Sequence, residues 1–277
     1  MLRAAIPVAL VVAVAGIVLA VGGSIDADDA QCGPGFSSEG ARCRVRGSSC
    51  PLPLVKTAHG CDAPPTRIDI PETTILASSS DWEAEGRIAP RSIHVAAFSL
   101  DAFEATVGAF FCPQCPYPDE KRYVAGDLAR AASAMTRNEA AHFCTLRGGR
   151  LPTEDEWIVA AAGNPPRRYP WGDTGAVCRR AAWGLATGPC SKKGDGPDTV
   201  GSHPEGATSL GVHDMAGNVA EWVDTADRDA SRGVARGGSW KTSLATDLRS
   251  WSRLEIGSAV KDPRLGVRCA YSGAARD

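Results

Sequence analysis

Several common catalytic signatures are missing from this chain of 277 residues. It contains no GxSxG turn, no HExxH zinc motif, no GxxxxGKS or GxxxxGKT phosphate loop, and no GxGxxG stretch before a helix. Each of these motifs positions a nucleophile, a metal ion or a phosphate group. The five histidines are scattered without the spacing of metal ligands. The sequence therefore argues against the common hydrolase, zinc-peptidase and nucleotide-binding classes.

An excess of charge is missing as well. The chain has 30 lysines and arginines against 32 aspartates and glutamates, which gives a net charge of −2. No basic patch interleaved with aromatic side chains is present. Because nucleic acids are bound largely through clustered positive charge, we expect no nucleic-acid partner.

No internal repeat is visible either. Glycine and proline, at 30 and 19 residues, are spread along the chain rather than concentrated in low-complexity tracts. With 43% hydrophobic residues the chain can bury a large core, in one large domain or two small ones. This composition is typical of a loop-rich globular protein.

The N-terminus carries the pattern of an export signal. Arg3 precedes an uncharged apolar run at residues 4–21, which is followed by Gly-Gly-Ser. The length of this run lies between that of a long signal peptide and that of a short membrane anchor. Residues 1–23 are therefore predicted to be a cleaved signal peptide or a retained anchor. In both cases the rest of the chain is expected to be extracytoplasmic, either secreted or anchored through residues 4–21.

The ten cysteines all follow this segment, and in an oxidising compartment they are expected to form disulfides. Four of them lie in a Gly/Ser/Arg/Pro-rich stretch at residues 24–65, which we interpret as a small stapled module or a tethered stalk and linker. Three pairings of these four are open from the sequence. They are Cys32, Cys43, Cys50 and Cys61.

Cys112 and Cys115 form a single CxxC pair. Such a pair can be a redox centre or half of a zinc site. No second CxxC and no neighbouring histidine completes a zinc site, so we favour a local disulfide.

Residues 66–277 are predicted to form the main domain, of the α+β class. Two capping boxes, Thr136 to Glu139 and Thr153 to Glu156, predict two helices that end at Gly148 and Gly163. The remaining segments are short runs divided by glycine and proline, which indicate turns and short strands.

The stretch DMAGNVAEW at residues 214–222 places two acids on either side of a Gly-Asn turn. Asp214 and Glu221 could converge on a hard cation such as Ca²⁺, which prefers oxygen ligands. They could equally be two unrelated surface acids beside a turn. The residues alone leave both interpretations open.

Five sequence pieces occur in an order that resembles the formylglycine-generating enzyme family, also called sulfatase-modifying factors. The likeness covers about residues 68–270. It implies one compact domain with little regular secondary structure, related to the C-type lectin fold and preceded by the Cys-rich segment. The pieces are GRLPTEDEW (149–157), YPWGD (169–173), GVHDMAGNVAEW (211–222), ARGGSW (235–240) and LGVRCA (265–270).

The resemblance implies a structural Ca²⁺ at the Gly-Asn turn. Asp214 and Glu221 would supply side-chain oxygens, and Gly217 and Val219 would supply backbone carbonyls. One departure is Ala220, where the family usually has tryptophan.

The resemblance also implies a disulfide between Cys144 and Cys269. Cys178 and Cys190 are predicted to pair across the segment between YPWGD and the Gly-Asn turn.

The oxidase activity of the family depends on Cu(I), a soft ion that two cysteines hold in a C-x4-C arrangement shortly after GGS. Counting from Ser239, the matching positions are Asp247 and Ser252, or Ala245 and Ser250 in an alternative register. No cysteine lies between Cys190 and Cys269. We therefore expect no copper and no formylglycine generation.

Two functional classes follow from this resemblance. The first is a binding or assembly module at the cell envelope, with an unknown protein or small molecule as its ligand. Candidate ligand-binding residues are Arg249, Trp251 and Arg253, whose types are common at binding hot spots, whereas Trp240 is expected in the core. The second is an enzyme of the family that carries out oxidative maturation, either formylglycine generation in sulfatases or a related reaction on a protein or small molecule.

Overall fold

The computed structural model describes residues 31–39, 42–77, 91–110, 127–226 and 229–273. The predicted export segment and the Cys112–Cys115 pair lie outside these ranges. Within them, no helix has both the length and the apolar character needed to cross a bilayer.

Two β-sheets form the body of the domain. Their strands are β5 (Arg67–Ile70), β8 (Phe98–Asp101), β9 (Ala220–Val223), β10 (Arg232–Arg236), β11 (Arg253–Gly257), β12 (Leu265–Gly266) and β13 (Ala270–Ser272). The larger sheet has the order β11–β10–β9–β12, antiparallel except for the parallel pair of β12 and β9. The smaller sheet has the antiparallel order β13–β8–β5. All four residues of β9 are buried, because this strand has a neighbour on each side.

Three hairpins and three 3-10 turns complete the regular backbone of the described residues. The hairpins pair β1 (Phe36–Glu39) with β2 (Arg42–Val45), β3 (Val55–Thr57) with β4 (Gly60–Asp62), and β6 (Thr73–Ala77) with β7 (Arg91–Val95). The 3-10 turns are η2 (Gly108–Phe110), η4 (Pro204–Gly206) and η5 (Ala245–Leu248).

The described part of the chain has two α-helices, α2 (Arg137–Leu146) and α3 (Glu154–Ala162), and both predicted capping boxes are confirmed. Before α3, the Thr153 hydroxyl accepts from the Glu156 amide at 3.1 Å, and Glu156 accepts from the Thr153 amide at 2.8 Å. These bonds satisfy amides that have no partner within the helix. Gly163 follows α3 in the left-handed region (φ 71°), where a side chain would be strained.

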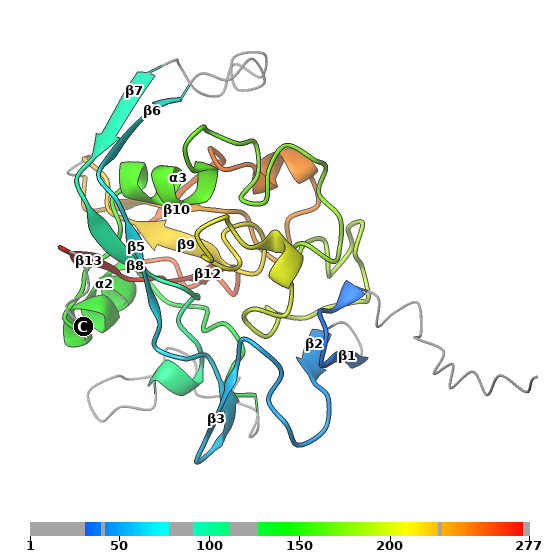
Figure 1. Ribbon diagram of the computed structural model, residues 1–277. Helices are drawn as coiled ribbons and strands as arrows, with labels where there is room; N and C mark the ends of the chain where they lie inside the picture. The colour runs from blue at the N-terminus through cyan, green and yellow to red at the C-terminus, as the bar shows by residue number, and fades with distance from the viewer. Residues whose placement is uncertain (1–30, 40–41, 78–90, 111–126, 227–228, 274–277) are drawn as a thin grey trace, which may run out of the picture.

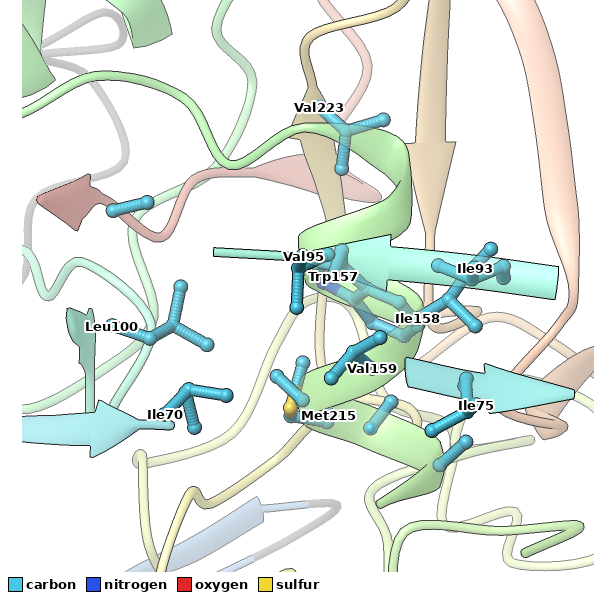
Figure 2. Close-up of a cluster of buried hydrophobic side chains, with 14 of the residues drawn as sticks. Ile70, Ile75, Ile93, Val95, Leu100, Trp157, Ile158, Val159, Met215 and Val223 are labelled. Carbon is cyan, nitrogen blue, oxygen red and sulfur yellow. The ribbon is translucent and has the colours of Figure 1, made fainter. Parts of the chain in front are cut away.

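Helix α3 packs against the β6–β7 hairpin and carries much of the core (Figure 1). Figure 2 shows Trp157 and Ile158 of the helix among Ile75 and Ile93 of the hairpin, and all four side chains are at most 2% exposed. Burying a side chain of this size contributes about 1.5–3 kcal/mol to the hydrophobic driving force. The structure confirms one compact α+β domain with short strands, two described helices and much irregular backbone.

The Cys-rich segment is a folded module that packs on the domain. Two local disulfides, Cys32–Cys43 and Cys50–Cys61, hold its hairpins. Phe36 and Leu54 of the module are buried in one cluster with Phe103 and Val200 of the domain. Figure 1 shows β1, β2 and β3 gathered against one side of the domain. The described residues of this segment are therefore stapled by disulfides and packed on the domain, and the predicted boundaries of the segment at residues 24 and 65 stay predictions.

The two disulfides predicted within the domain are both present. Cys144 of α2 bonds to Cys269 next to β13, with an S–S distance of 2.01 Å, and Cys178 bonds to Cys190. The first closes a loop with a sequence separation of 125. It thereby ties the C-terminal segment to α2.

Candidate functional site

The Gly-Asn turn at residues 214–219 enters the buried strand β9. Asp214, Gly217 and Asn218 have φ angles of 57°, 83° and 52°, so the backbone is left-handed three times in five residues and cannot be helical. Glycine is required at 217, because a Cβ there would lie 2.5 Å from the Ala182 carbonyl oxygen. The predicted turn is therefore present, and it is packed against the rest of the domain.

Glu221, at the far end of the turn, is bound by a buried arginine. Arg268 donates to it from Nη2 at 2.8 Å and from Nε at 3.1 Å, and Trp157 donates from its indole at 2.7 Å. Arg268 is itself fully buried and also donates to the carbonyls of Asp101 and His213. Trp157, Glu221 and Arg268 belong to three of the five sequence pieces, so these contacts bring the three pieces together at one point in the core.

Two further buried acids lie around the turn. Asp214 accepts from the Gly201 amide at 2.6 Å, and Glu104 accepts from the Asn218 side chain at 2.5 Å and the Val219 amide at 3.0 Å. Burial, and then the charges of Asp214 and Glu221, raise the pKa of Glu104 well above its usual value. This local excess of acid is opposed by the Arg268 guanidinium.

Glu221 does not fit a calcium ligand in this arrangement. Both of its oxygens already accept charged or neutral N–H donors, and a cation at Glu221 would lie against the Arg268 guanidinium. No described contact tests the donor atoms of Asp214, Gly217 and Val219. Calcium at this turn stays a prediction for those three residues.

A cavity of about 210 Å³ opens beside β9, β10 and β11. Its apolar wall is formed by alanine and leucine, and its polar wall carries three hydroxyl groups, one carboxylate and two guanidinium groups. The lining residues are Ala220, Ala235, Gly238, Ser239, Thr242, Asp247, Ser252, Arg253, Leu254 and Arg264.

Asp247 and Ser252 both line this cavity, whereas Ala245 and Ser250 are not among its lining residues. The first pair comprises the positions obtained by counting from Ser239, and the second pair belongs to the alternative register. Asp247 ends up at the cavity because η5 folds back over the Gly237-Gly238 bend, where a Cβ on Gly238 would lie 2.8 Å from the Asp247 carbonyl oxygen. The two positions of the first register therefore share one cavity, and those of the alternative register are not part of its lining.

The two arginines of the cavity wall have acidic partners. Arg253 donates to Glu154 at 2.6 Å and also pairs with Glu255. Arg264 donates to both oxygens of Asp262, at 2.9 and 2.7 Å. These carboxylates therefore partly balance the positive charge of the two arginines.

The three predicted ligand-binding residues differ in their exposure to solvent. Arg253 is exposed and lines the cavity. Arg249 and Trp251 are only 8% and 3% exposed, and Trp251 lies in the main hydrophobic cluster, so a ligand-binding role at these two positions stays a prediction. Trp240 is buried as expected, and its indole donates to the Pro263 carbonyl at 3.0 Å.

The sequence profile of the sulfatase-modifying factor enzyme 1-like domain matches residues 59–272, which is most of the chain. The chain belongs to this family. The match begins at residue 59, inside the Cys-rich module, and therefore includes Cys61 of the Cys50–Cys61 disulfide.

Curated relatives of this sulfatase-modifying factor domain include a protein named as inactive and one named as an oxygenase. It is 35% identical over 151 residues to the inactive C-alpha-formylglycine-generating enzyme 2 of Bos taurus, across 50% of this chain and 49% of that protein. It is 33% identical over 148 residues to the hercynine oxygenase of Mycolicibacterium thermoresistibile, across 42% of this chain and 31% of that protein. The chain spans about half, or less, of the length of these relatives.

Solved structures show the same fold at lower identity. Treponema denticola variable protein 1 superposes with a TM-score of 0.63 at 20% identity, over 75% of this chain and 95% of that one. PvdO from Pseudomonas aeruginosa superposes with a TM-score of 0.60 at 17% identity, over 80% and 99%. At such identities the likeness concerns the fold alone.

Several important residues of the sulfatase-modifying factor domain were not found by sequence reasoning. Glu104 lies 114 residues from Asn218, and no motif marks it. Arg264 precedes the LGVRCA piece and carries no motif signal of its own. Arg268 lies within that piece, so its position was visible but its partner was not.

Proposed function

We propose that this chain is an exported sulfatase-modifying factor domain that lacks the formylglycine-generating oxidase reaction and acts as a binding or assembly module at the cell envelope. The observation that carries the proposal is the cavity whose wall contains Asp247 and Ser252. Counted from Ser239, these are the two positions at which the resemblance expects thiolate ligands for copper.

The chemistry of this pair supports the loss of the copper centre. Cu(I) is a soft ion that selects thiolates, whereas a carboxylate and a hydroxyl are hard oxygen ligands. The eight cysteines in the described part of the chain are all paired in disulfides, so none of them offers a thiolate. The bovine relative, which is named as inactive, is in line with this proposal.

The size and lining of the cavity suggest the kind of ligand. Its volume of about 210 Å³ is below the range of ~300–1,000 Å³ that is typical of sites for drug-sized molecules. A small group, either a fragment-sized molecule or one side chain of a protein partner, suits this space. The apolar wall at Ala220 and Leu254 would receive its apolar part, and Ser239, Ser252 and Asp247 would receive its polar part.

Export is supported by the disulfides. Structural disulfides persist in oxidising compartments and are rare in the cytosol of most organisms. Fractionation of cells that produce the full-length protein is expected to place it outside the cytoplasm, with the disulfides intact on non-reducing gels.

A second candidate function is oxidative chemistry of another kind, which the similarity to hercynine oxygenase favours. The two candidates differ in a measurable way. A binding module returns its ligand unchanged, whereas an oxygenase consumes O₂ in a substrate-dependent manner.

The decisive experiment incubates the purified protein with Cu(I), O₂ and a peptide that contains Cys-x-Pro-x-Arg. We expect no stoichiometric copper and no mass loss of the peptide cysteine. A matched gain-of-site variant, Asp247→Cys with Ser252→Cys, is expected to bind Cu(I), because both positions line one cavity. Peptide conversion by the wild-type protein would overturn the proposal.

A further inference from the structure

Cys43, Asp198 and His203 bring three potential metal-ligand atoms together where the Cys-rich module meets the domain. Their ligand atoms all lie within 4.8 Å of one another, and each residue is at most 4% exposed. His203 Nε2 is 3.3 Å from an Asp198 oxygen and 4.0 Å from Cys43 Sγ. No other group of three His, Cys, Asp or Glu residues meets this distance in the described part of the chain.

The two distances that involve His203 are close to those of a tetrahedral zinc site. Zinc bonds of about 2.0–2.1 Å to nitrogen and oxygen and about 2.3 Å to sulfur place the nitrogen and oxygen about 3.3 Å apart, and the nitrogen and sulfur about 3.6 Å apart. The first separation matches the 3.3 Å between His203 and Asp198. The second requires Cys43 Sγ to approach by a few tenths of an ångström.

Cys43 is bonded to Cys32 in the structure, and a disulfide sulfur is a poor ligand compared with a thiolate. We propose that Cys43, Asp198 and His203 form a site for Zn²⁺ or a similar divalent metal, which the Cys32–Cys43 disulfide blocks and which reduction by a thiol opens. The fourth coordination position is left for water or an exogenous ligand.

The reduction step requires an external thiol. Its thiolate attacks Cys32, which is half-buried, while Cys43 is fully buried. The Cys32–Cys43 bond breaks, a mixed disulfide forms on Cys32, and Cys43 leaves as a thiolate. A second thiol then attacks this mixed disulfide, frees Cys32 as a thiolate and forms a disulfide with the first thiol. Two electrons therefore pass from the two external thiols to the Cys32–Cys43 disulfide. A divalent metal would then be held by the Cys43 thiolate, an Asp198 oxygen and His203 Nε2, and any proton on that nitrogen would pass to water.

The surroundings favour a metal at this site. The His203 ring lies next to Cys43 Sγ, at 4.0 Å from Nε2, so the two potential ligand atoms already face each other. Asp198 is fixed, because one of its oxygens accepts from the backbone amides of Cys43 at 2.6 Å and Thr199 at 3.0 Å. The other oxygen of Asp198 faces His203 Nε2 at 3.3 Å.

A metal here would link two parts of the fold. Cys43 belongs to the Cys-rich module, and Asp198 and His203 belong to the domain, 155 and 160 residues further along the chain. The Cys32–Cys43 disulfide is internal to the module. Exchange of the disulfide for a metal would therefore replace a bond within the module by a bond between the module and the domain.

The test uses full-length Cys32→Ser protein, which frees Cys43 while the other disulfides remain. Titration with Co²⁺ is expected to give a thiolate-to-cobalt charge-transfer band with one equivalent of metal, and Zn²⁺ is expected to abolish it. The wild-type oxidised protein should show no band. Adding His203→Ala to Cys32→Ser should weaken binding by more than ~10-fold.

The matched control is Cys32→Ser with Cys43→Ser, which lacks the disulfide but keeps Asp198 and His203. It should fold like Cys32→Ser and give no thiolate band. No band in folded Cys32→Ser, or an equal band in its His203→Ala derivative, would overturn the proposal. If Cys32→Ser does not fold, reduced wild-type protein provides the second measurement. Zn²⁺ should then slow alkylation of Cys43 and leave that of Cys61 unchanged, and equal rates at Cys43 with and without Zn²⁺ would contradict the site.

Discussion

Arg268 binds both carboxylate oxygens of Glu221, and neither side chain is more than 1% exposed. Removing one member of such a buried pair leaves the other charge without compensation, at a cost of about 3–5 kcal/mol. We expect Glu221→Gln to lower the free energy of unfolding by that amount in urea titrations. Glu205→Gln is the control, because Glu205 and Arg179 are both more than half exposed, and a change within about 0.5 kcal/mol is expected. Equal effects of the two variants would contradict the importance of the buried pair.

The calcium prediction for Asp214, Gly217 and Val219 can be tested separately from this ion pair. It expects a chelator to lower the Tm of the wild-type protein and to leave the Tm of Asp214→Ala unchanged. Glu221→Gln should lose stability with or without chelator, because its defect is the unpaired Arg268. A wild-type Tm that is the same with calcium and with chelator rules the calcium site out.

The two disulfides of the domain should differ in their effect on stability. In the chain-entropy relation, a loop of 125 residues corresponds to about 5 kcal/mol and one of 12 residues to about 3 kcal/mol. We therefore expect the double variant Cys144→Ala/Cys269→Ala to be less stable than Cys178→Ala/Cys190→Ala. Guanidinium titrations of both variants measure this order, and the reverse order would show that strain or packing outweighs loop entropy.

The His203–Asp198 pair predicts a dependence of stability on pH. Burial opposes the charged ring, but the hydrogen bond and the charge of Asp198 outweigh it and raise the pKa of His203 above 6.5. The stability gained from protonation is therefore fully present below about pH 6.5 and is lost as the pH rises through the folded pKa.

The measurement for this pair is the difference in unfolding free energy between the wild-type protein and His203→Gln. We expect the difference to shrink between about pH 5.5 and pH 8.5. His213 contributes in the opposite direction, because burial lowers its pKa, and the comparison with His203→Gln removes that contribution.

The cavity predicts an unusual tolerance at Ala220. Ala220→Trp can place its indole in the 210 Å³ of space beside β9, so we expect a loss of stability of at most about 1.5 kcal/mol. Ala161→Trp is the matched control, because Ala161 is fully buried in α3 and does not line the cavity, and a loss of about 3 kcal/mol or more is expected there. Thermal melts measure both. If Ala220→Trp is as disruptive as Ala161→Trp, the cavity is not available space.

Local patterns in the sequence were reliable guides to structure. The capping boxes at Thr136 and Thr153 set the starts of both described helices, because each box depends on residues only three positions apart. The family resemblance placed Cys144 next to Cys269 across the whole domain, which composition and spacing could not do.

Relationships over long distances were not visible in the sequence. The positions of Asp214 and Glu221 suggested a shared cation. In the structure, Glu221 is paired with an arginine that lies 47 residues further along the chain. Trp251 lies between two serines in the sequence, so its sequence neighbours do not indicate that it packs in the main hydrophobic cluster. The cluster of Cys43 and His203 depends on how the module packs against the domain, and no motif encodes that contact.

The C-terminal segment has a consequence for how the protein is made. β12 lies against β9, Arg268 neutralises Glu221, and Cys269 closes the disulfide to Cys144. All three contributions come from the last part of the described chain to leave a ribosome or an export channel. Until then, the acids around the turn have no guanidinium beside them and β9 has an open edge. Folding of this domain must therefore finish only after its C-terminal segment has been synthesised, when the chain is nearly complete.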